Sequence, residues 1–467
     1  MLFSSISFLY YFLPIVLILY FAVPFKFKNF ILLLASLFFY FYGEPIYTLL
    51  MLATTVSSYI HGLLIDRFRG TKWSKVFLVT SVITSLLVLG FFKYTDFFIT
   101  NINAISKAEI PLLKIALPIG ISFYTFQTLS YTIDVYRCEA LVQKSFIRLA
   151  TYVALFPQLI AGPIVRYTTV EAELKERTHS FENFAVGLNR FILGLGKKVL
   201  IANTLGELCE IFRASDDKSV VFYWIYACAY CLHVYFDFSG YSDMAIGLGR
   251  VFGFNFLENF NYPFISKSVA EFWRRWHMSL GTWFRDYVYI PLGGNRVNKL
   301  AWFRNILIVW FLTGFWHGAD WTFIVWGLYF ALFLLLEKFF LAKFFAKIPR
   351  VFSHIYVLFV VAISFVIFNA NGMGQAISDI GGLLGLQNLP FFSTETLYYI
   401  RSYGIVLLLG IIGATPLVKR SVEKFRTTRV GDWILTVAEP MVQIALIVVI
   451  TAYLVDGSFN PFLYFRF

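Results

Sequence analysis

Long apolar stretches separated by short polar turns follow one another along almost the whole chain. An α-helix needs about 20 mostly apolar residues to cross the hydrocarbon core of a bilayer, and most of these stretches are close to that length. The pattern therefore predicts an all-α polytopic membrane protein with roughly 11–13 membrane-embedded helices, some of them broken by glycine or proline. The predicted segments are residues 5–24, 28–43, 46–64, 76–95, 111–132, 146–165, 184–203, 219–240, 303–319, 322–341, 351–371, 403–418 and 433–455.

Composition indicates the same class of protein. Hydrophobic residues make up 59% of the 467 residues, and charged residues make up only 14%. An average soluble domain is about 25% charged, so a soluble surface cannot be built from this chain. A soluble enzyme, a disordered binder and a disulfide-stapled secreted domain are excluded. Because no repeat or pair of matching halves is found, we expect a single membrane-embedded domain over residues 1–467.

The basic residues predict how the chain is oriented. Lysine and arginine outnumber aspartate and glutamate by 12, and the excess is concentrated in a few loops. Such loops usually stay on the cytoplasmic side, facing anionic headgroups, so this charge does not indicate nucleic acid as a partner. The N-terminus is then predicted outside, and the Gly-rich segment 372–401 is external. The loops predicted to be cytoplasmic are residues 26–28, 67–75, 267–304 and 419–429.

His317 is the most informative ionisable residue. It ends an apolar run, it lies between Trp316 and Gly318, and Gly314 precedes it by one helical turn. Ionisable groups at membrane depth are costly and are usually functional. A buried imidazole stays neutral, which is the form that a general base needs. The alternative is a structural histidine that forms a hydrogen bond to a neighbouring helix.

His277 lies in a segment that combines tryptophans at helical spacing with three arginines, Arg274, Arg275 and Arg285. This pattern predicts an amphipathic interfacial or re-entrant helix over residues 271–295. One interpretation is a membrane-surface anchor. The other is a collar at the cytoplasmic mouth of a tunnel, because arginine suits a polyanionic donor such as coenzyme A or a phosphopantetheine carrier.

Two further polar stretches cross apolar surroundings. Residues 118–137 include Gln127, and residues 233–243 include Asp237. These side chains could line a polar path or simply hold helices together. We find no phosphate-binding loop, dinucleotide fingerprint, zinc-protease motif or serine-hydrolase elbow, and we expect no metal site.

Several motifs together resemble the membrane-bound O-acyltransferase (MBOAT) family, in particular its bacterial alginate O-acetyltransferase-like branch. The resemblance implies an MBOAT-like helical bundle around a central tunnel, in the cytoplasmic (inner) membrane of a bacterium. His317, in its Trp-His-Gly context, matches the invariant histidine of the family, and His277 matches a second one. The motifs are residues 118–137, 156–167, 235–243, 271–295, 312–327 and the tail 460–467.

The resemblance also implies the reaction and its participants. An acyl group, most often acetyl, would pass from a cytoplasmic thioester such as acetyl-coenzyme A to a hydroxyl on the outer side, with no bound cofactor. His317 would act as the base. His277, Arg274, Arg275 and Arg285 would hold the donor, and Gln127 and Asp237 would line the tunnel. The implied partners are membrane lipid, a secreted or periplasmic acyltransferase of the SGNH type, and a polysaccharide as the final acceptor.

Three alternatives remain open at this point. Within the family, the chain could transfer D-alanine from a carrier protein toward teichoic acid. Outside it, the polar path would suit a transporter without chemistry, although the Trp-His-Gly context argues against this. A membrane scaffold for a polysaccharide synthase is the third.

Overall fold

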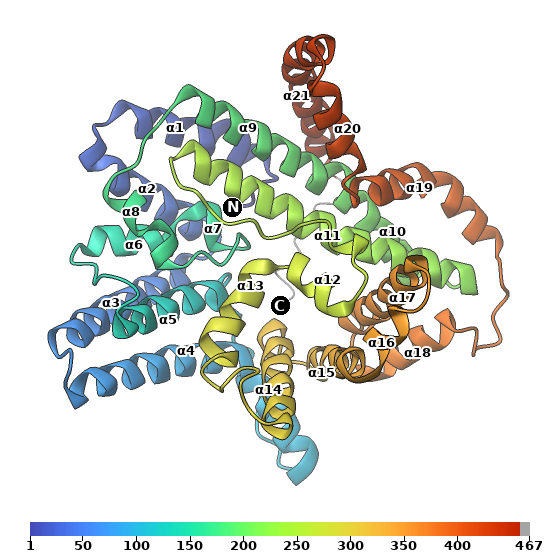
Figure 1. Cartoon of the computed structure of the whole chain (residues 1–467), viewed down its shortest axis with the longest axis horizontal. Helices are drawn as coiled ribbons and strands as arrows, with labels where there is room; N and C mark the ends of the chain where they lie inside the picture. The colour runs from blue at the N-terminus through green and yellow to red at the C-terminus, as the bar shows by residue number, and fades with distance from the viewer. Residues whose placement is uncertain (458–467) are drawn as a thin grey trace. The chain divides into compact units, whose positions relative to one another are not determined.

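We analysed a computed structural model of the chain, which describes residues 1–457 (Figure 1). Within these residues the secondary structure is entirely helical, which confirms the predicted all-α class. The tail 460–467, part of the family resemblance, lies outside the described residues. The helices are η1 (Phe8–Phe12), α1 (Leu13–Ala22), α2 (Phe25–Phe41), α3 (Pro45–Arg67), α4 (Lys72–Ser106), α5 (Ile121–Arg137), α6 (Phe146–Ala154), α7 (Phe156–Leu159), α8 (Tyr167–Lys175), α9 (Phe181–Gly196), η2 (Lys197–Ala202), α10 (Asn203–Ala214), α11 (Val220–Val251), η3 (Pro263–Ile265), α12 (Val269–Arg275), α13 (Met278–Phe284), η4 (Arg285–Tyr289), α14 (Lys299–His317), α15 (Trp321–Leu336), η5 (Glu337–Leu341), α16 (Ala342–Phe345), α17 (Arg350–Asn369), α18 (Met373–Leu383), α19 (Thr394–Gly413), α20 (Leu417–Arg426) and α21 (Arg429–Asp456).

The helices group into two compact units, each of them discontinuous in sequence. Unit 1 contains Met1–Phe191 and Tyr241–Leu257. Unit 2 contains Ile192–Gly240 and the chain from Glu258 onward. Helices α9 and α11 contribute residues to both units. That the whole chain acts as one domain stays a prediction.

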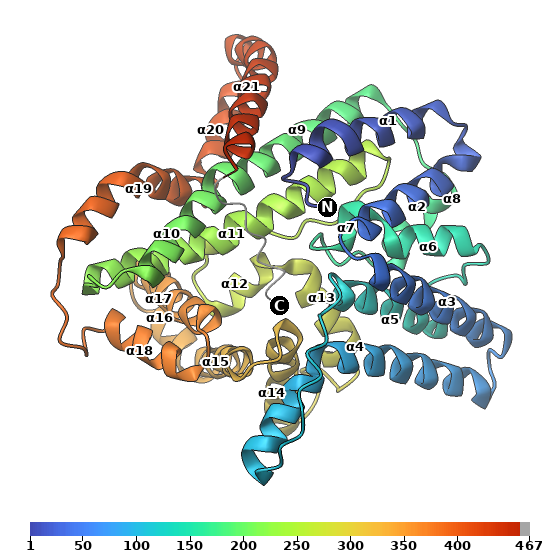
Figure 2. The ribbon, with the colours of Figure 1, turned by 180° about the vertical axis from the view of Figure 1, so that it is seen from behind.

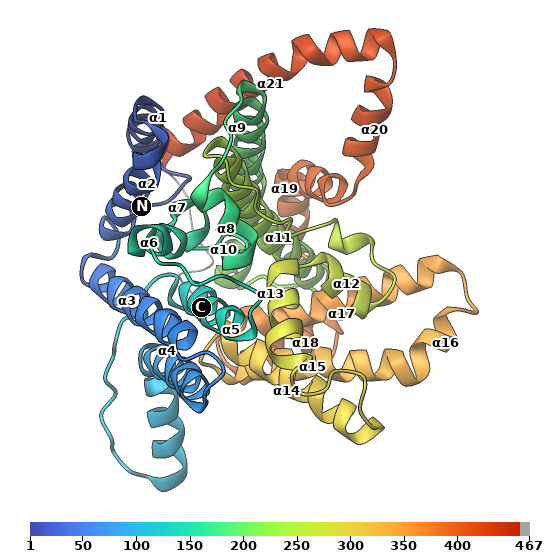
Figure 3. The same ribbon diagram turned by 60° about the vertical axis from the view of Figure 1, so that its left-hand side comes forward.

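Within unit 1, helices α3, α4 and α5 lie side by side (Figures 2 and 3). Almost every side chain of α5 is buried, including its serines and threonines. Several of these hydroxyls donate to carbonyls of their own helix, as Ser130 Oγ does to the Gln127 carbonyl at 2.8 Å. A polar helix can be buried in this way because the hydroxyl groups find acceptors without leaving the helix.

Glycines bring α9 and α11 into backbone contact. Gly187 and Gly194 are seven residues apart on α9, and Gly240 and Gly247 are seven apart on α11. A spacing of seven places both members of a pair on the same helical face. In unit 1 an added Cβ on Gly247 would lie 2.5 Å from the Gly187 carbonyl oxygen, and in unit 2 one on Gly240 would lie 2.7 Å from that of Gly194. Small residues are what allow such close antiparallel packing in membrane proteins.

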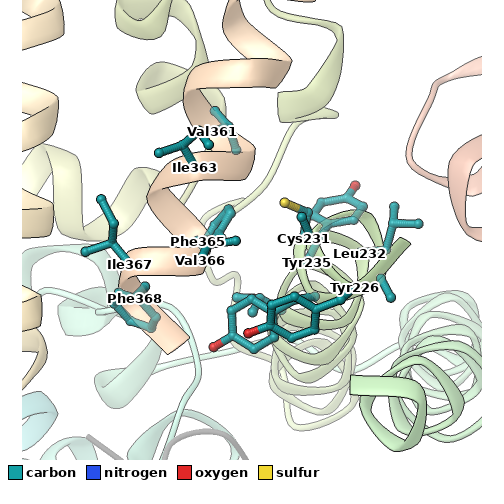
Figure 4. Close-up of a cluster of buried hydrophobic side chains, with 14 of the residues drawn as sticks. Tyr226, Cys231, Leu232, Tyr235, Val361, Ile363, Phe365, Val366, Ile367 and Phe368 are labelled. Carbon is teal, nitrogen blue, oxygen red and sulfur yellow. The ribbon is translucent and has the colours of Figure 1, made fainter. Parts of the chain in front are cut away.

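Unit 2 has an apolar core between the first part of α11 and α17. Tyr226 and Tyr235 of α11 face Phe365 and Phe368 of α17 in this cluster (Figure 4). Beside α17, α14 and α15 form a tight hairpin, because Gly314 of α14 and Gly327 of α15 meet without side chains between them.

Among residues 1–457, seven helices are long and apolar enough to span a membrane, which makes the chain a multi-pass membrane protein by length and composition. The predicted number of embedded segments was larger, because it counted shorter apolar runs such as Phe8–Ala22 and α2. The count of embedded segments and the central tunnel stay predictions. The seven are Pro45–Arg67, Lys72–Ser106, Val220–Val251, Trp321–Phe345, Arg350–Asn369, Thr394–Gly413 and Arg429–Asp456.

Two of the predicted segments are interrupted, in line with the prediction that glycine or proline breaks some of them. The segment 111–132 becomes helical only at Ile121, after Pro111 and Pro118, because proline lacks the backbone donor of a helix interior. The segment 146–165 breaks at Leu155, whose backbone is non-helical, and a four-residue helix containing Pro157 follows. The predicted single amphipathic helix over 271–295 was wrong, since α12 and α13 are separated at Trp276 and His277.

The glycine contact can be tested with Gly247→Ala. The added methyl would meet the backbone of α9, so we expect a destabilisation of about 1–3 kcal/mol. The measurement is the thermal unfolding midpoint in detergent. The matched control is Gly90→Ala on α4, where an added Cβ meets nothing within 4 Å. Equal midpoints for the two variants would contradict the close packing of α9 on α11.

Candidate active site

His277 occupies the break between α12 and α13. Its backbone lies in the left-handed region, with φ 45°, which is rare for a residue with a Cβ. Helix α12 is itself fixed in place, because Ser268 caps it by accepting from the Glu271 N–H at 2.9 Å. The carboxylate of Glu337 accepts from the Val269 and Ala270 N–H groups of the same first turn. Strained backbone of this kind tends to mark functional sites.

The amide of Asn259 determines the tautomer of His277. Its Oδ1 lies 3.1 Å from His277 Nδ1, and it accepts from the Ser279 hydroxyl at 2.9 Å and the Ser279 N–H at 3.3 Å. Because a backbone N–H can only donate, the oxygen of the Asn259 amide must face this group. His277 Nδ1 therefore carries the proton, and Nε2 carries the lone pair.

The lone pair of His277 is buried among aromatic side chains. The residue is 2% exposed, and among the described residues Nε2 has no hydrogen-bond partner. The ring packs edge-on against Phe238 with centroids 4.6 Å apart. Burial lowers the pKa of His277 to about 3, so its imidazole is neutral at physiological pH. A neutral imidazole with a vacant acceptor nitrogen is equipped to take a proton.

His317 is the last residue of α14 and is half-buried among aromatic rings. Trp316 and Trp326 each lie 4.9 Å from its ring centroid, and Phe368 lies 5.4 Å away, all three nearly edge-on. The helix can end here because Gly318 packs directly on the Phe323 ring, where a larger residue would clash.

Trp316 connects the two predicted catalytic residues. Its ring centroid is 4.9 Å from that of His317 and 6.1 Å from that of His277. The structure thus brings both histidines to one tryptophan, although 40 residues separate them (317 − 277). The same cluster holds two indole N–H groups, of Trp273 and Trp326, that are buried without an acceptor among residues 1–457. Buried donors without acceptors are uncommon and are suited to a polar ligand.

The three predicted donor-binding arginines differ in their surroundings. Arg275 forms an ion pair with Glu271 at 3.0 Å, and Arg285 forms one with Asp286 at 2.6 Å. Arg274 is exposed and makes no ion pair within the described part of the chain. Arg274 is therefore the member of the set whose charge is most available to an anionic donor.

The two predicted tunnel-lining residues lie in different units. Asp237 is buried in unit 2 and forms an ion pair with Lys198 at 2.5 Å, a partner that the sequence did not indicate. Gln127 is buried in unit 1, and its Oε1 has no hydrogen-bond partner among residues 1–457. Their place on a tunnel stays a prediction.

Sequence reasoning missed Asn259, which fixes the tautomer of His277. Asn259 lies 18 residues before His277, in a non-helical segment, and no motif marks it. It also missed Glu337, which caps α12 from 68 residues away. Within residues 1–457 no group of three or more His, Cys, Asp or Glu side chains is placed to hold a metal ion.

The described chain is all-helical, and two of its histidines lie beside one tryptophan. Residues 46–373 match the sequence profile of the MBOAT, membrane-bound O-acyltransferase family. The chain therefore belongs to this family, which confirms the resemblance, and it is an acyltransferase.

The chain is also similar to individual curated proteins of known description. The chain is 37% identical to "Probable alginate O-acetylase AlgI" of Azotobacter vinelandii, over 100% of both chains. It is 32% identical to "Peptidoglycan O-acetyltransferase" of Helicobacter pylori, over 100% of this chain and 98% of that one. It is 30% identical to "Teichoic acid D-alanyltransferase" of Bacillus subtilis, over only 48% of this chain and 59% of that one.

The lowered pKa of His277 predicts a pH-dependent stability. Between pH 6.5 and 3 the unfolded chain binds a proton at this residue and the folded chain does not, so stability should fall as the pH falls through this window. The contribution is up to about 1.4 kcal/mol per pH unit. Thermal midpoints across this range should fall more steeply for the wild type than for His277→Gln. Parallel profiles would show that His277 is not held neutral.

Proposed function

We propose that this chain transfers an acyl group, most simply acetyl, from a cytoplasmic thioester to a hydroxyl during O-acetylation of a secreted or cell-wall polysaccharide. The observation that carries the proposal is the pair of histidines beside Trp316, among aromatic side chains. Membership of an acyltransferase family and full-length similarity to two polysaccharide O-acetylating relatives support it.

His317 acts as the general base in this proposal. The acceptor hydroxyl loses its proton to the imidazole as its oxygen attacks the thioester carbonyl. The carbon–sulfur bond then breaks, and the thiolate leaves and takes up the proton. A thioester is already activated, so the protein mainly needs to position the two substrates and the base. The indole N–H groups of Trp273 and Trp326 are candidate donors to oxygen atoms of the substrate.

His277 and the arginines hold the donor. Arg274 offers an exposed guanidinium to the phosphates of coenzyme A or of a phosphopantetheine carrier. Arg275 and Arg285, already paired with carboxylates, contribute less charge. His277 helps to orient the donor, since its Nε2 is a buried acceptor near the aromatic cluster and can accept from an amide N–H of the phosphopantetheine arm.

The cellular setting follows from the same proposal. The chain lies in the bacterial cytoplasmic membrane with its N-terminus outside, because the basic loops stay in the cytoplasm. Lipid surrounds it, and a secreted or periplasmic SGNH-type acyltransferase completes transfer to the polysaccharide. D-alanyl transfer toward teichoic acid is the second candidate, supported by the partial match to the Bacillus subtilis relative.

The first test is turnover by His317→Ala. Purified wild-type protein should release coenzyme A from radiolabelled acetyl-coenzyme A. In the variant the rate of this release should be lower by at least about a hundredfold, which is the usual contribution of a general base. The control is His61→Gln on α3, whose imidazole bonds only within its own helix, to Ser57. Turnover that survives in His317→Ala would refute the assignment. Turnover with a D-alanyl carrier protein but not with acetyl-coenzyme A would favour the second candidate.

Arg274 and Arg285 are expected to contribute differently to binding of the acyl donor. Arg274→Gln should raise the KM for the donor roughly tenfold with kcat unchanged, because it removes a charge that contributes to binding alone. Arg285→Gln should have a smaller effect, since Asp286 already neutralises that guanidinium. Steady-state kinetics at varied donor concentration make the comparison. Equal effects of the two substitutions would contradict the ranking.

A further inference from the structure

Two cationic side chains, Lys28 and Arg177, and the imidazole of His179 gather around Tyr20 in unit 1, away from the histidines of the candidate active site. Lys28, in the first turns of α2, places Nζ 4.4 Å from the centroid of the Tyr20 ring and 4.8 Å from that of Phe21. Arg177 and His179 come from the segment between α8 and α9. The cluster therefore joins the predicted cytoplasmic loop at residues 26–28 to a segment about 150 residues later in the chain (177 − 28 = 149).

Hydrogen bonds hold this cluster in a defined geometry. The Tyr20 hydroxyl donates to the Phe252 carbonyl at 2.7 Å, and its oxygen accepts from Arg177 Nε at 2.9 Å. His179 Nε2 lies 2.8 Å from the same oxygen, and since the hydroxyl proton is already used, Nε2 is the donor. Arg177 Nη1 donates to Asn29 Oδ1 at 2.7 Å.

No carboxylate within residues 1–457 makes a direct ion pair with this cluster. Among the described residues none of Lys28, Arg177 and His179 forms an ion pair, although Arg177 is 6% exposed and Lys28 is 9% exposed. Burial lowers the pKa of Arg177, and Glu173 lies close enough to oppose this shift, but the Glu173 carboxylate forms no direct ion pair with that guanidinium and instead accepts from the Asn255 side chain at 2.7 Å. Buried basic side chains are almost always paired, so an unpaired group of them is unusual.

Two further observations favour binding of an anion at this cluster. Arg177 Nη2 is buried and has no acceptor within residues 1–457. Burial, and then the charges of Lys28 and Arg177, lowers the pKa of His179, so a proton on this ring is disfavoured unless an anion lies beside it. An anion between these groups would favour that proton and would give Arg177 Nη2 an acceptor.

The surroundings of the cluster indicate which anion fits. Phe21 is 42% exposed and Phe27 is 47% exposed. Lys26, which lies between these two residues in the sequence, is also exposed. Exposed aromatic side chains next to basic ones are typical of the headgroup level of a membrane. Basic pockets at this level bind phosphate-bearing headgroups.

We propose that Lys28, Arg177 and His179 form a binding site for the phosphate group of an anionic ligand, and that the headgroup of an anionic phospholipid supplies it. Arg177 and Lys28 provide charge, and His179 provides a second donor once it is protonated. The site is independent of the acyl-transfer proposal, because it shares no residue with it.

The test is lipid retention by purified full-length protein in detergent, followed by native mass spectrometry. Wild type should retain phosphatidylglycerol in preference to phosphatidylcholine. Lys28→Gln should weaken that binding roughly five- to tenfold, as expected for one charge at a membrane surface. Lys26→Gln is the matched control, since it removes the same charge from an exposed side chain two residues away. His179→Gln is a second test variant, and circular dichroism confirms that each variant is folded.

Inorganic phosphate and pyrophosphate, added at millimolar concentration, distinguish the two sources of the anion. If they raise the thermal midpoint of wild type but not of Lys28→Gln, and phosphatidylglycerol has no preference, the site stands and its ligand is a soluble phosphate. Equal retention of both lipids together with no response to phosphate would overturn the proposal. Equal losses in Lys26→Gln and Lys28→Gln would overturn it as well.

Discussion

One acceptor, the amide oxygen of Asn259, holds the part of unit 2 on which the candidate active site depends. Three donors from His277 and Ser279 converge on it. These bonds accompany the left-handed backbone of His277, which separates α12 from α13 and turns the imidazole into the aromatic cluster. In an interior without water, losing such an acceptor leaves buried donors unsatisfied at about 1–3 kcal/mol each.

Several other buried polar groups in unit 2 have partners, in contrast to those of the candidate active site. In unit 2 the buried Lys198 is paired with Asp237, and the half-buried Arg213 is paired with Asp379. Structural histidines bond to carbonyls, as His233 Nδ1 does to Ala202 at 2.7 Å. Against that background, the vacant Nε2 of His277 and the indole N–H groups of Trp273 and Trp326 stand out as groups that a substrate can satisfy. The cationic cluster around Tyr20 in unit 1 is the corresponding exception among charged side chains.

Glycine provides the other recurring constraint. Gly314 and Gly327 let α14 and α15 pack closely enough for His317, at the end of α14, to contact Trp326 of α15. The seven-residue spacing of Gly187 and Gly194 on α9, matched on α11, is visible in the sequence, but which helix faces which is not. A heptad spacing defines a face, whereas the partner of that face depends on how distant segments pack.

The sequence by itself determined the class of protein, the all-α fold, most of the helices and the family, because span length and hydrophobicity are local properties of the chain. It also singled out His277 and His317, since ionisable residues in apolar surroundings are few. It expected breaks at proline or glycine without locating those at Pro118 and Leu155, and it was wrong about a single helix through His277, because local backbone geometry outweighed apolar length there. Only the tertiary structure decided that Asn259 fixes the tautomer of His277, that Trp316 lies between the two histidines, and that Lys28, Arg177 and His179 meet at Tyr20. Such pairings depend on burial and on contacts between segments far apart in the chain, which no local pattern encodes.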